Sequence, residues 1–237
     1  MTDDTAPAVP PLALGVILPS SNRVVERATE AALAAVPGVA AAYARVPYDA
    51  LTRPGREAYD ETVFLDAAHL LADAGVAAIG WNATRGAALG FAPDERLCER
   101  LARRTGLPVV TTALAARDRL RAAGHRRLGL VVQGGPEEAA LVRGRFTAAG
   151  CPVAAAVSLG ITENRLAAFV PPARLAAAAL AAAEDADAVL IWSTNLAGWR
   201  LPSVIRDRPL LDATVIGTQA LLAAAGLAGP ETAPLAP

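Results

Sequence analysis

Leu12-Ala13-Leu14-Gly15-Val16-Ile17-Leu18 is an unbroken apolar run that ends in Pro19-Ser20-Ser21-Asn22. A run this short, closed by turn residues, is typical of a strand buried on both faces in a parallel sheet. Asn22 belongs to the residue types that cap helices, and the pattern after it predicts a helix to about Ala35. Because strand, polar loop and helix then alternate along the chain, the sequence predicts a doubly wound α/β fold.

The pattern begins again at Arg127, where a second apolar strand ends in Gln133-Gly134-Gly135. Gly15 and Gly129, in the two apolar strands, lie 114 residues apart, and a later pair of polar loops has nearly the same spacing. Such a repeat predicts two similar α/β halves with parallel sheets and a ligand cleft between them.

The expected domain limits follow from this repeat. We place a disordered N-terminal tip at residues 1–11, the first half at 12–118 and the second half at 119–217. A C-terminal helix at residues 218–228 can pack with the first half.

The composition excludes several classes of protein. The chain has 237 residues, of which 54% are hydrophobic and 19% charged, as in a compact globular protein. Its net charge is −1 with no run of like charges, which argues against a nucleic-acid partner. It contains no lysine, so it can be neither a pyridoxal phosphate enzyme nor a nucleotide-binding protein of the Walker type. No Gly-x-Gly-x-x-Gly follows a strand, so no dinucleotide site is expected.

Metal, membrane and export signals are also missing from the sequence. Cys98 and Cys151 are far apart, and no His/Cys pair has the spacing of metal ligands. The first residues carry Asp3 and Asp4 where a signal peptide would be positive, and the alanine-rich stretch 173–183 is too short to span a bilayer. We therefore expect a cytoplasmic protein without cofactor, metal or membrane partner.

Six short motifs follow one another along the chain: Gly15-Val16-Ile17-Leu18-Pro19-Ser20-Ser21-Asn22, Arg45-Val46-Pro47, Thr105-Gly106-Leu107-Pro108, Ser158-Leu159-Gly160-Ile161, Ser193-Thr194-Asn195-Leu196 and Gly217-Thr218-Gln219-Ala220. In this order they resemble the maleate isomerase and arylmalonate decarboxylase branch of the Asp/Glu racemase superfamily. The resemblance implies a lyase or isomerase (decarboxylase, cis-trans isomerase or racemase) that acts on a small organic acid without a cofactor. It also implies a homo-oligomer.

The chain departs from this family at both catalytic cysteines. Where the family reads Gly-Cys-Thr-Ser, this chain has Asn82-Ala83-Thr84-Arg85, and where it reads Ser-Cys-Thr-Asn, the chain has Trp192-Ser193-Thr194-Asn195. A family tyrosine after the fifth strand is replaced by Gln133-Gly134-Gly135. A thiol, with a pKa of about 8.5, can both take and give a proton at carbon, whereas a serine hydroxyl needs an adjacent base. The expected mechanism therefore uses no cysteine.

The candidate site residues lie in the loops that match the family. We assign catalytic roles to Ser193, Thr84 and Arg85. Substrate-binding roles fall to Ser20, Ser21, Asn22, Tyr59, Trp81, Asn82, Ala83, Gln133, Gly134, Trp192, Thr194, Asn195 and Thr218. Their hydroxyl and amide groups can hold a carboxylate, and Arg85 can pair with one through two hydrogen bonds.

Each of these assignments has a structural alternative. The polar loop residues can simply cap helices, Arg85 can point to solvent, and Trp81 and Trp192 can close the hydrophobic core instead of walling the cleft. Glu137 and Glu138 are possible bases, but a first helical turn favours acidic residues in any protein. Two other functions therefore stay open, namely a ligand-binding pseudoenzyme and a hydrolase or transferase that uses Ser193 as its nucleophile.

Overall fold

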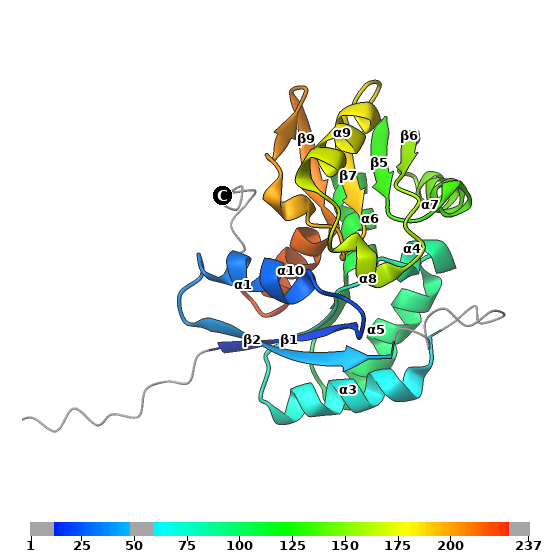
Figure 1. Cartoon of the computed structure of the whole chain (residues 1–237). Helices are drawn as coiled ribbons and strands as arrows, with labels where there is room; N and C mark the ends of the chain where they lie inside the picture. Colours follow the sequence, from blue (N-terminus) through cyan, green and yellow to red (C-terminus); the bar gives the residue numbers. More distant parts are fainter. Residues whose placement is uncertain (1–11, 48–58, 228–237) are drawn as a thin grey trace, which may run out of the picture.

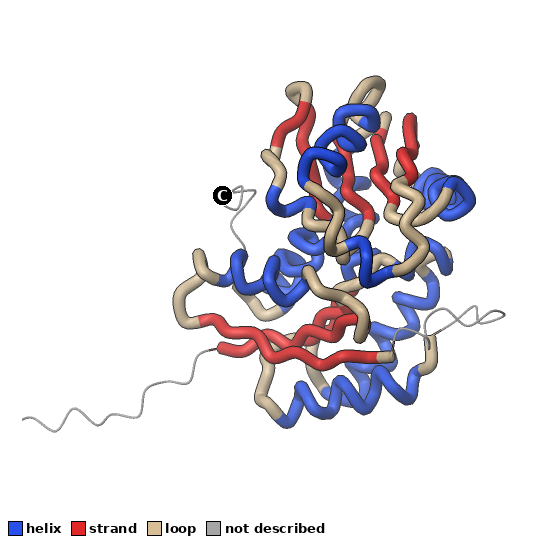
Figure 2. Tube along the Cα trace, in the orientation of Figure 1, coloured by secondary structure: helices blue, strands red, loops and turns tan. Residues whose placement is uncertain are grey.

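The structure, a computed structural model, describes residues 12–47 and 59–227 (Figure 1). The tip predicted at residues 1–11 and the last residue of the C-terminal helix predicted at 218–228 lie outside this part of the chain. Within it, two separate β-sheets are each flanked by helices (Figure 2). No helix in the described ranges is long and apolar enough to cross a membrane.

The first half is a parallel sheet with the strand order β2-β1-β3-β4. Its elements are β1 (Leu12–Pro19), α1 (Val25–Leu33), β2 (Val39–Val46), α3 (Glu61–Asp73), β3 (Ile79–Trp81), α4 (Arg85–Leu89), α5 (Ala92–Thr105), β4 (Val109–Thr111) and α6 (Thr112–Ala123). β1 is central, since Gly15 pairs with Ala42 on one side and with Ile79 on the other. This buried position explains why its apolar residues do not alternate with polar ones.

The second half repeats this arrangement with the order β6-β5-β7-β9-β8. Its elements are β5 (Leu128–Val132), α7 (Pro136–Ala148), β6 (Val153–Ser158), α8 (Asn164–Ala167), α9 (Pro172–Ala182), β7 (Ala188–Trp192), the 3-10 helix η1 (Gly198–Arg200), β8 (Val204–Ile205), β9 (Arg208–Asp212) and α10 (Ala213–Ala224). The strands are parallel except for β8, which pairs antiparallel with β9. The parallel strands β6-β5-β7-β9 correspond one by one to β2-β1-β3-β4, and only β8 has no counterpart. This correspondence confirms the predicted fold of two similar halves with parallel sheets.

The two halves exchange their last helices. α6 follows β4 of the first half, but its buried residues join the core between β5, β7 and α7. α10 follows β9 of the second half, yet Leu221 and Leu222 pack on β1 together with α1. The predicted limits at residues 118 and 217 therefore fall inside α6 and α10, the two helices that join the halves. α3 and α5 cover the other face of the first sheet, and α9 the other face of the second.

Candidate functional site

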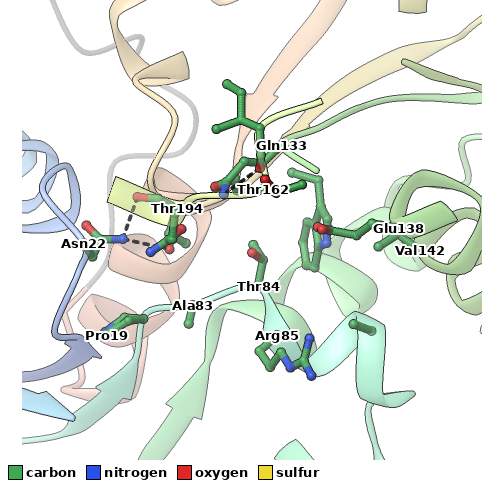
Figure 3. Close-up of a pocket in the computed structure, with 15 residues that line it drawn as sticks. Pro19, Asn22, Ala83, Thr84, Arg85, Gln133, Glu138, Val142, Thr162 and Thr194 are labelled. Carbon is green, nitrogen blue, oxygen red and sulfur yellow. Dashed lines mark hydrogen bonds between the residues drawn. The ribbon is translucent and has the colours of Figure 1, made fainter. Parts of the chain in front are cut away.

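A cleft opens between the halves at the carboxyl ends of β1, β3, β5 and β7 (Figure 3). Its volume is about 100 Å³. The lining comes from both halves: Pro19, Asn22, Ala83, Thr84, Arg85, Ala88, Gln133, Glu138, Val142, Ile161, Thr162, Asn164, Trp192, Ser193 and Thr194. Open α/β sheets bind ligands at this edge because several loops converge there.

Ala83 and Ser193 follow corresponding strands and line the same cleft. Neither thiol of the chain lines the cleft: Cys98 lies in α5, and Cys151 is buried just before β6. Burial raises the pKa of Cys98 to about 12, with help from the nearby carboxylate of Asp94. A thiol with so high a pKa stays protonated and unreactive near neutral pH.

Ser193 is tied to Gln133, the residue after β5. Its Oγ donates to Oε1 of Gln133 at 2.7 Å and accepts from the backbone N–H of Asn195 at 3.1 Å. No described carboxylate or histidine is hydrogen-bonded to the Ser193 hydroxyl, so nothing in this part of the chain is placed to remove its proton.

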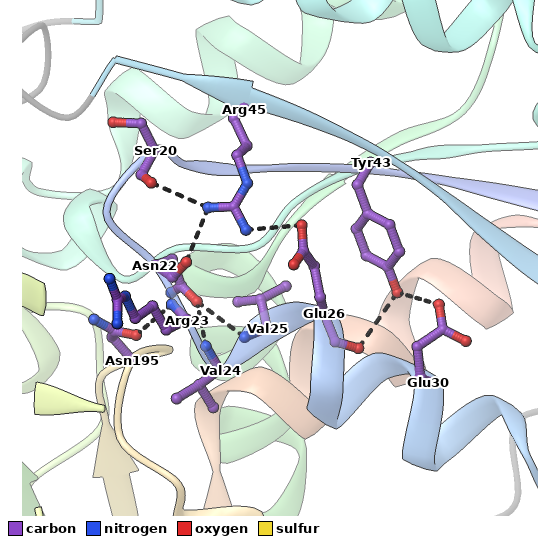
Figure 4. Close-up of polar contacts among 10 residues, drawn as sticks. All are labelled: Ser20, Asn22, Arg23, Val24, Val25, Glu26, Glu30, Tyr43, Arg45 and Asn195. Carbon is purple, nitrogen blue, oxygen red and sulfur yellow. Dashed lines mark hydrogen bonds and ion pairs between the residues drawn. The ribbon is translucent and has the colours of Figure 1, made fainter. Parts of the chain in front are cut away.

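The loop after β1 is held in place by capping and by an arginine (Figure 4). Oδ1 of Asn22 accepts from the backbone N–H groups of Val24 and Val25, both at 2.9 Å, and so caps α1. Arg45 of β2 donates to the carbonyl oxygens of Ser20 and Asn22 and pairs with Glu26 of α1 at 2.8 Å. Asn22 thus lines the cleft and caps a helix at once, while Ser20 is exposed outside the lining.

Polar side chains connect this loop to the second half. Nδ2 of Asn22 donates to the carbonyl and hydroxyl oxygens of Thr194 at 3.1 and 3.3 Å. Oδ1 of Asn195 accepts from the backbone N–H of Arg23, and its Nδ2 donates to the carbonyl oxygen of Asn164. Ser21 accepts from Asn164 Nδ2 at 2.7 Å. Ser21 and Asn195 therefore join the two halves and lie outside the cleft lining.

Arg85, the first residue of α4, stands out among the arginines. In the described ranges only Arg85, Arg117 and Arg119 are not exposed. Arg117 forms ion pairs with Glu95 and Asp118, but Arg85 forms none, and its buried Nε has no hydrogen-bond partner in the described structure. A half-buried guanidinium that forms no ion pair is costly, because burial removes water that no directly paired charge replaces.

Glu138 is the cleft residue that sequence reasoning undervalued. The residue is exposed overall, but its carboxyl group reaches toward the middle of the cleft from the first turn of α7 (Figure 3). Desolvation raises the pKa of this carboxyl group, and the charge of Arg85 acts in the opposite direction. Gly134 makes room for it, since a Cβ at this residue would collide with Oε2 of Glu138. Gly134 itself does not line the cleft.

The aromatic residues divide between cleft and core. Trp192 lines the cleft and also packs edge-on against Phe146 at 4.8 Å. Trp81 is fully buried, and its indole N–H donates to the hydroxyl of Tyr59, which in turn donates to Asp94 at 2.9 Å. Trp81 and Tyr59 are therefore core residues below the cleft. Burial raises the pKa of Asp94 to about 6, although the hydrogen bonds that its carboxyl group accepts lower this pKa.

Asn82 and Thr218 are likewise buried beneath the cleft. Asn82 accepts from Thr112 and donates to the carbonyl oxygen of Thr214, the second residue of α10. Thr218 donates to that same carbonyl oxygen and contacts the Thr29 hydroxyl of α1 at 3.2 Å. Neither belongs to the cleft lining, so both stabilise the contact between the halves.

The loop between β6 and α8 supplies the lining that sequence reasoning missed. Ile161 and Thr162 come from this loop, which continues the motif Ser158-Leu159-Gly160-Ile161, and Asn164 is the first residue of α8. That motif was the available signal, but nothing in it shows that the chain folds back over the cleft. Among residues 12–47 and 59–227, no group of three or more His, Cys, Asp or Glu side chains can hold a metal ion.

Solved structures with this fold include two maleate isomerases. A cysteine-to-alanine variant of Iso from Pseudomonas putida S16, with maleate, is 22% identical (TM-score 0.76; 91% of this chain and 92% of that chain covered). A cysteine-to-serine variant of the Nocardia farcinica maleate cis-trans isomerase, with a covalently bound succinylcysteine intermediate, is also 22% identical (TM-score 0.77; 91% and 93%).

An arylmalonate decarboxylase structure is 25% identical, with a TM-score of 0.72 over 90% of this chain and 92% of that chain. No curated protein matches the chain. The family model of arylmalonate decarboxylase, however, matches residues 21–233, which is most of the sequence. The chain therefore belongs to the arylmalonate decarboxylase family.

Proposed function

We propose that the cleft binds a small organic acid and decarboxylates it without a cofactor and without a cysteine. The observation that carries the proposal is the charge content of the cleft. Among its described lining residues only Arg85 and Glu138 are ionisable, one a fixed cation and the other a carboxyl group with a raised pKa. This pair supplies one anion-binding group and one proton-transfer group.

Arg85 holds the carboxylate that stays on the substrate. Its guanidinium forms no ion pair in the described structure and its buried Nε has no hydrogen-bond partner, and a bidentate carboxylate would supply both contacts. Thr84, the preceding residue, lines the same cleft and forms no side-chain hydrogen bond with another described residue, so its hydroxyl is available to the same carboxylate. As carbon dioxide leaves, the negative charge moves onto the remaining carboxyl group as an enediolate, and these donors stabilise it there.

Glu138 then protonates the carbon. For a malonate, R–CH(COO⁻)₂ loses carbon dioxide, the electron pair of the broken C–C bond enters the enediolate, and the proton of Glu138 forms the new C–H bond. The product is R–CH₂–COO⁻, and the carboxylate of Glu138 regains its proton from water. One proton donor is enough for this reaction, whereas racemisation needs an acid and a base on opposite faces of the carbon.

Decarboxylation also fits the cleft better than isomerisation through a covalent adduct. The maleate cis-trans isomerase variant described above carries a succinylcysteine intermediate, in which sulfur is bonded to the substrate. Here Ala83 and Ser193 line the cleft, and the Ser193 hydroxyl donates a hydrogen bond to the neutral amide of Gln133. An unactivated hydroxyl is a poor nucleophile for such an addition.

The test is turnover of phenylmalonate in D₂O, followed by NMR, with maleate as the isomerase substrate. We expect phenylacetate with one deuterium at the α-carbon and no fumarate. Glu138→Gln should lower kcat by about 10²- to 10⁴-fold, the usual effect of losing a general acid, while the exposed neighbour Glu137→Gln is the matched control. Arg85→Met should raise KM by about 10- to 100-fold, with exposed Arg143→Met as its control.

The pH profile separates a proton donor from a purely structural carboxyl group. Because Glu138 must be protonated to act, kcat should fall as the pH rises through its raised pKa. Glu138→Gln should remove this limb of the profile, and Glu137→Gln should keep it. Equal kcat in Glu138→Gln and the wild type would refute the proposal.

A ligand-binding protein without turnover is the second candidate. This candidate is supported by the side chains of Asn22, Ser193 and Thr194, which form their hydrogen bonds with other residues of the protein. In that case phenylmalonate raises the melting temperature of the wild type but not of Arg85→Met, and no product forms. A homo-oligomer also remains a proposal, which analytical ultracentrifugation tests.

A further inference from the structure

A second pocket lies between the β8–β9 hairpin, η1 and the helices α6 and α10 (Figure 1 labels β9, α6 and α10). Its volume is about 370 Å³, within the range of pockets that hold small molecules. The walls are mostly apolar, formed by side chains such as Leu201, Val204, Pro209, Leu211 and Ile216. None of its described lining residues also lines the cleft.

Arg119 of α6 contributes the charge of this pocket. Arg85, Arg117 and Arg119 are the only described arginines that are not exposed, and Arg117 has two carboxylate partners. Arg119 has no ion pair among the described residues and donates a hydrogen bond to the neutral amide oxygen of Gln219. Each of the two pockets therefore holds one half-buried guanidinium that forms no ion pair with a described carboxylate.

The one carboxyl group in the described lining does not neutralise Arg119. Asp212 is only 7% exposed, and its Oδ1 accepts from the backbone N–H of Val215 at 3.0 Å, which caps α10. It forms no ion pair with Arg119. Burial lowers the pKa of Arg119, because the charged guanidinium loses water that no anion replaces. A bound anion would offset this cost.

We propose that this pocket binds a small carboxylic acid with an apolar body, with its carboxylate on Arg119 and its body on the apolar walls. Gln219 orients the guanidinium, and the walls exclude water from the ion pair, which strengthens it. The proposal is independent of the function of the cleft, because it rests on different residues.

Tryptophan fluorine NMR can test the site directly. The chain has three tryptophans, and each occupies a different environment: Trp199 lines the second pocket, Trp192 the cleft, and Trp81 the core. Protein labelled with 5-fluorotryptophan is titrated with hexanoate, and the three signals are assigned with single Trp→Phe variants. We expect a saturable shift of the Trp199 signal while the Trp81 signal stays unchanged.

The charge of Arg119 is tested with ligands and with variants. On the unaltered protein, hexanoate should bind about tenfold or more tightly than neutral hexanamide, as expected for one charge-assisted contact. Arg119→Met should weaken hexanoate binding at the Trp199 signal by a similar factor, Arg119→Lys should weaken it less, and Arg85→Met should leave it unchanged.

Three results would overturn the proposal. Equal binding of hexanoate and hexanamide would show that Arg119 does not recognise the acid. A hexanoate shift confined to the Trp192 signal would place the acid in the cleft alone. A Trp199 signal that moves with protein concentration in the absence of hexanoate would show that a second copy of the chain covers the pocket.

Discussion

Oγ of Ser193 donates a 2.7 Å hydrogen bond to Oε1 of Gln133, across the cleft end of neighbouring strands β7 and β5. A serine nucleophile needs its proton to point at a base, but an amide oxygen is a neutral acceptor that does not take the proton. One lone pair of the Ser193 hydroxyl oxygen accepts from the backbone N–H of Asn195. This geometry favours a structural role, in which Ser193 and Gln133 fix two cleft loops against each other.

Ser193→Ala should therefore reduce kcat by less than about tenfold, far below the loss caused by removing a nucleophile. A serine-reactive fluorophosphonate should leave the protein unlabelled, as intact-protein mass spectrometry would show. Gln133→Leu is the matched partner variant, and combining it with Ser193→Ala should cost little more than either change alone. Stoichiometric labelling at Ser193 would instead establish the hydrolase or transferase mechanism.

Thiol alkylation should leave turnover nearly unchanged. Cys98 and Cys151 lie outside the cleft lining, and burial raises the pKa of both thiols. We expect a Cys98→Ala, Cys151→Ala variant that folds to keep wild-type kcat and KM with the substrate that the cleft accepts. Inactivation by one equivalent of iodoacetamide, prevented by substrate, would contradict a mechanism without cysteine.

Gly134→Ala should lower kcat by moving Glu138. A Cβ at residue 134 would collide with the carboxyl end of the Glu138 side chain and would lie 3.2 Å from the Cβ of Glu138, so the carboxyl group must shift. We expect about a tenfold or greater fall in kcat, since misplacing a catalytic group by about 1 Å has effects of this size. Gly135→Ala is the control, because a Cβ there meets no atom within 4 Å. Equal losses in both variants would mean that helix capping, not Glu138, sets the rate.

The strand pattern could be predicted from the sequence because apolar runs and polar loops are local signals. β1 covers the apolar run from Leu12 to Leu18, and the repeat after Arg127 corresponds to the second sheet. The exchange of α6 and α10 could not be predicted, since their amphipathic faces do not record which sheet they cover. The short helix α4 could not be predicted either, because a helix of 5 residues has too few turns to show a periodic pattern.

The candidate site was harder to predict than the fold. Trp81 and Trp192 are the last residues of β3 and β7, but the register places Trp81 beside Ile17 of β1 and Trp192 one position further along, beside Val132 of β5. Successive strand residues point to opposite faces of a sheet, so Trp81 packs with Tyr59 and Phe64, whereas Trp192 packs against Phe146 and reaches the cleft lining. Glu138 was also hard to identify from the sequence, because a glutamate in a first helical turn is common in proteins. The space that Gly134 leaves for its carboxyl group is visible only in the structure.

The free energy of unfolding of Asp212→Asn, relative to that of the wild type, should increase as the pH rises. Asp212 caps α10, and burial raises the pKa of its carboxyl group to about 7, against the backbone N–H groups that lower it. In the unfolded chain the pKa of an aspartate is about 3.9. Between these two values the folded protein keeps a proton that the unfolded chain releases, so wild-type stability falls as the pH rises through this window and is level above it.

Asparagine keeps an oxygen for the N–H of Val215 and does not titrate, so the variant lacks this loss. The free energy of unfolding of Asp212→Asn, minus that of the wild type, should therefore increase by a few kcal/mol from about pH 4 to pH 7 and then stay constant. Urea unfolding at a series of pH values measures it. Asp94→Asn is the comparison, because the pKa of Asp94, about 6, ends its window earlier. A difference between Asp212→Asn and wild type that does not change with pH would show that Asp212 is ionised in the folded protein throughout this range.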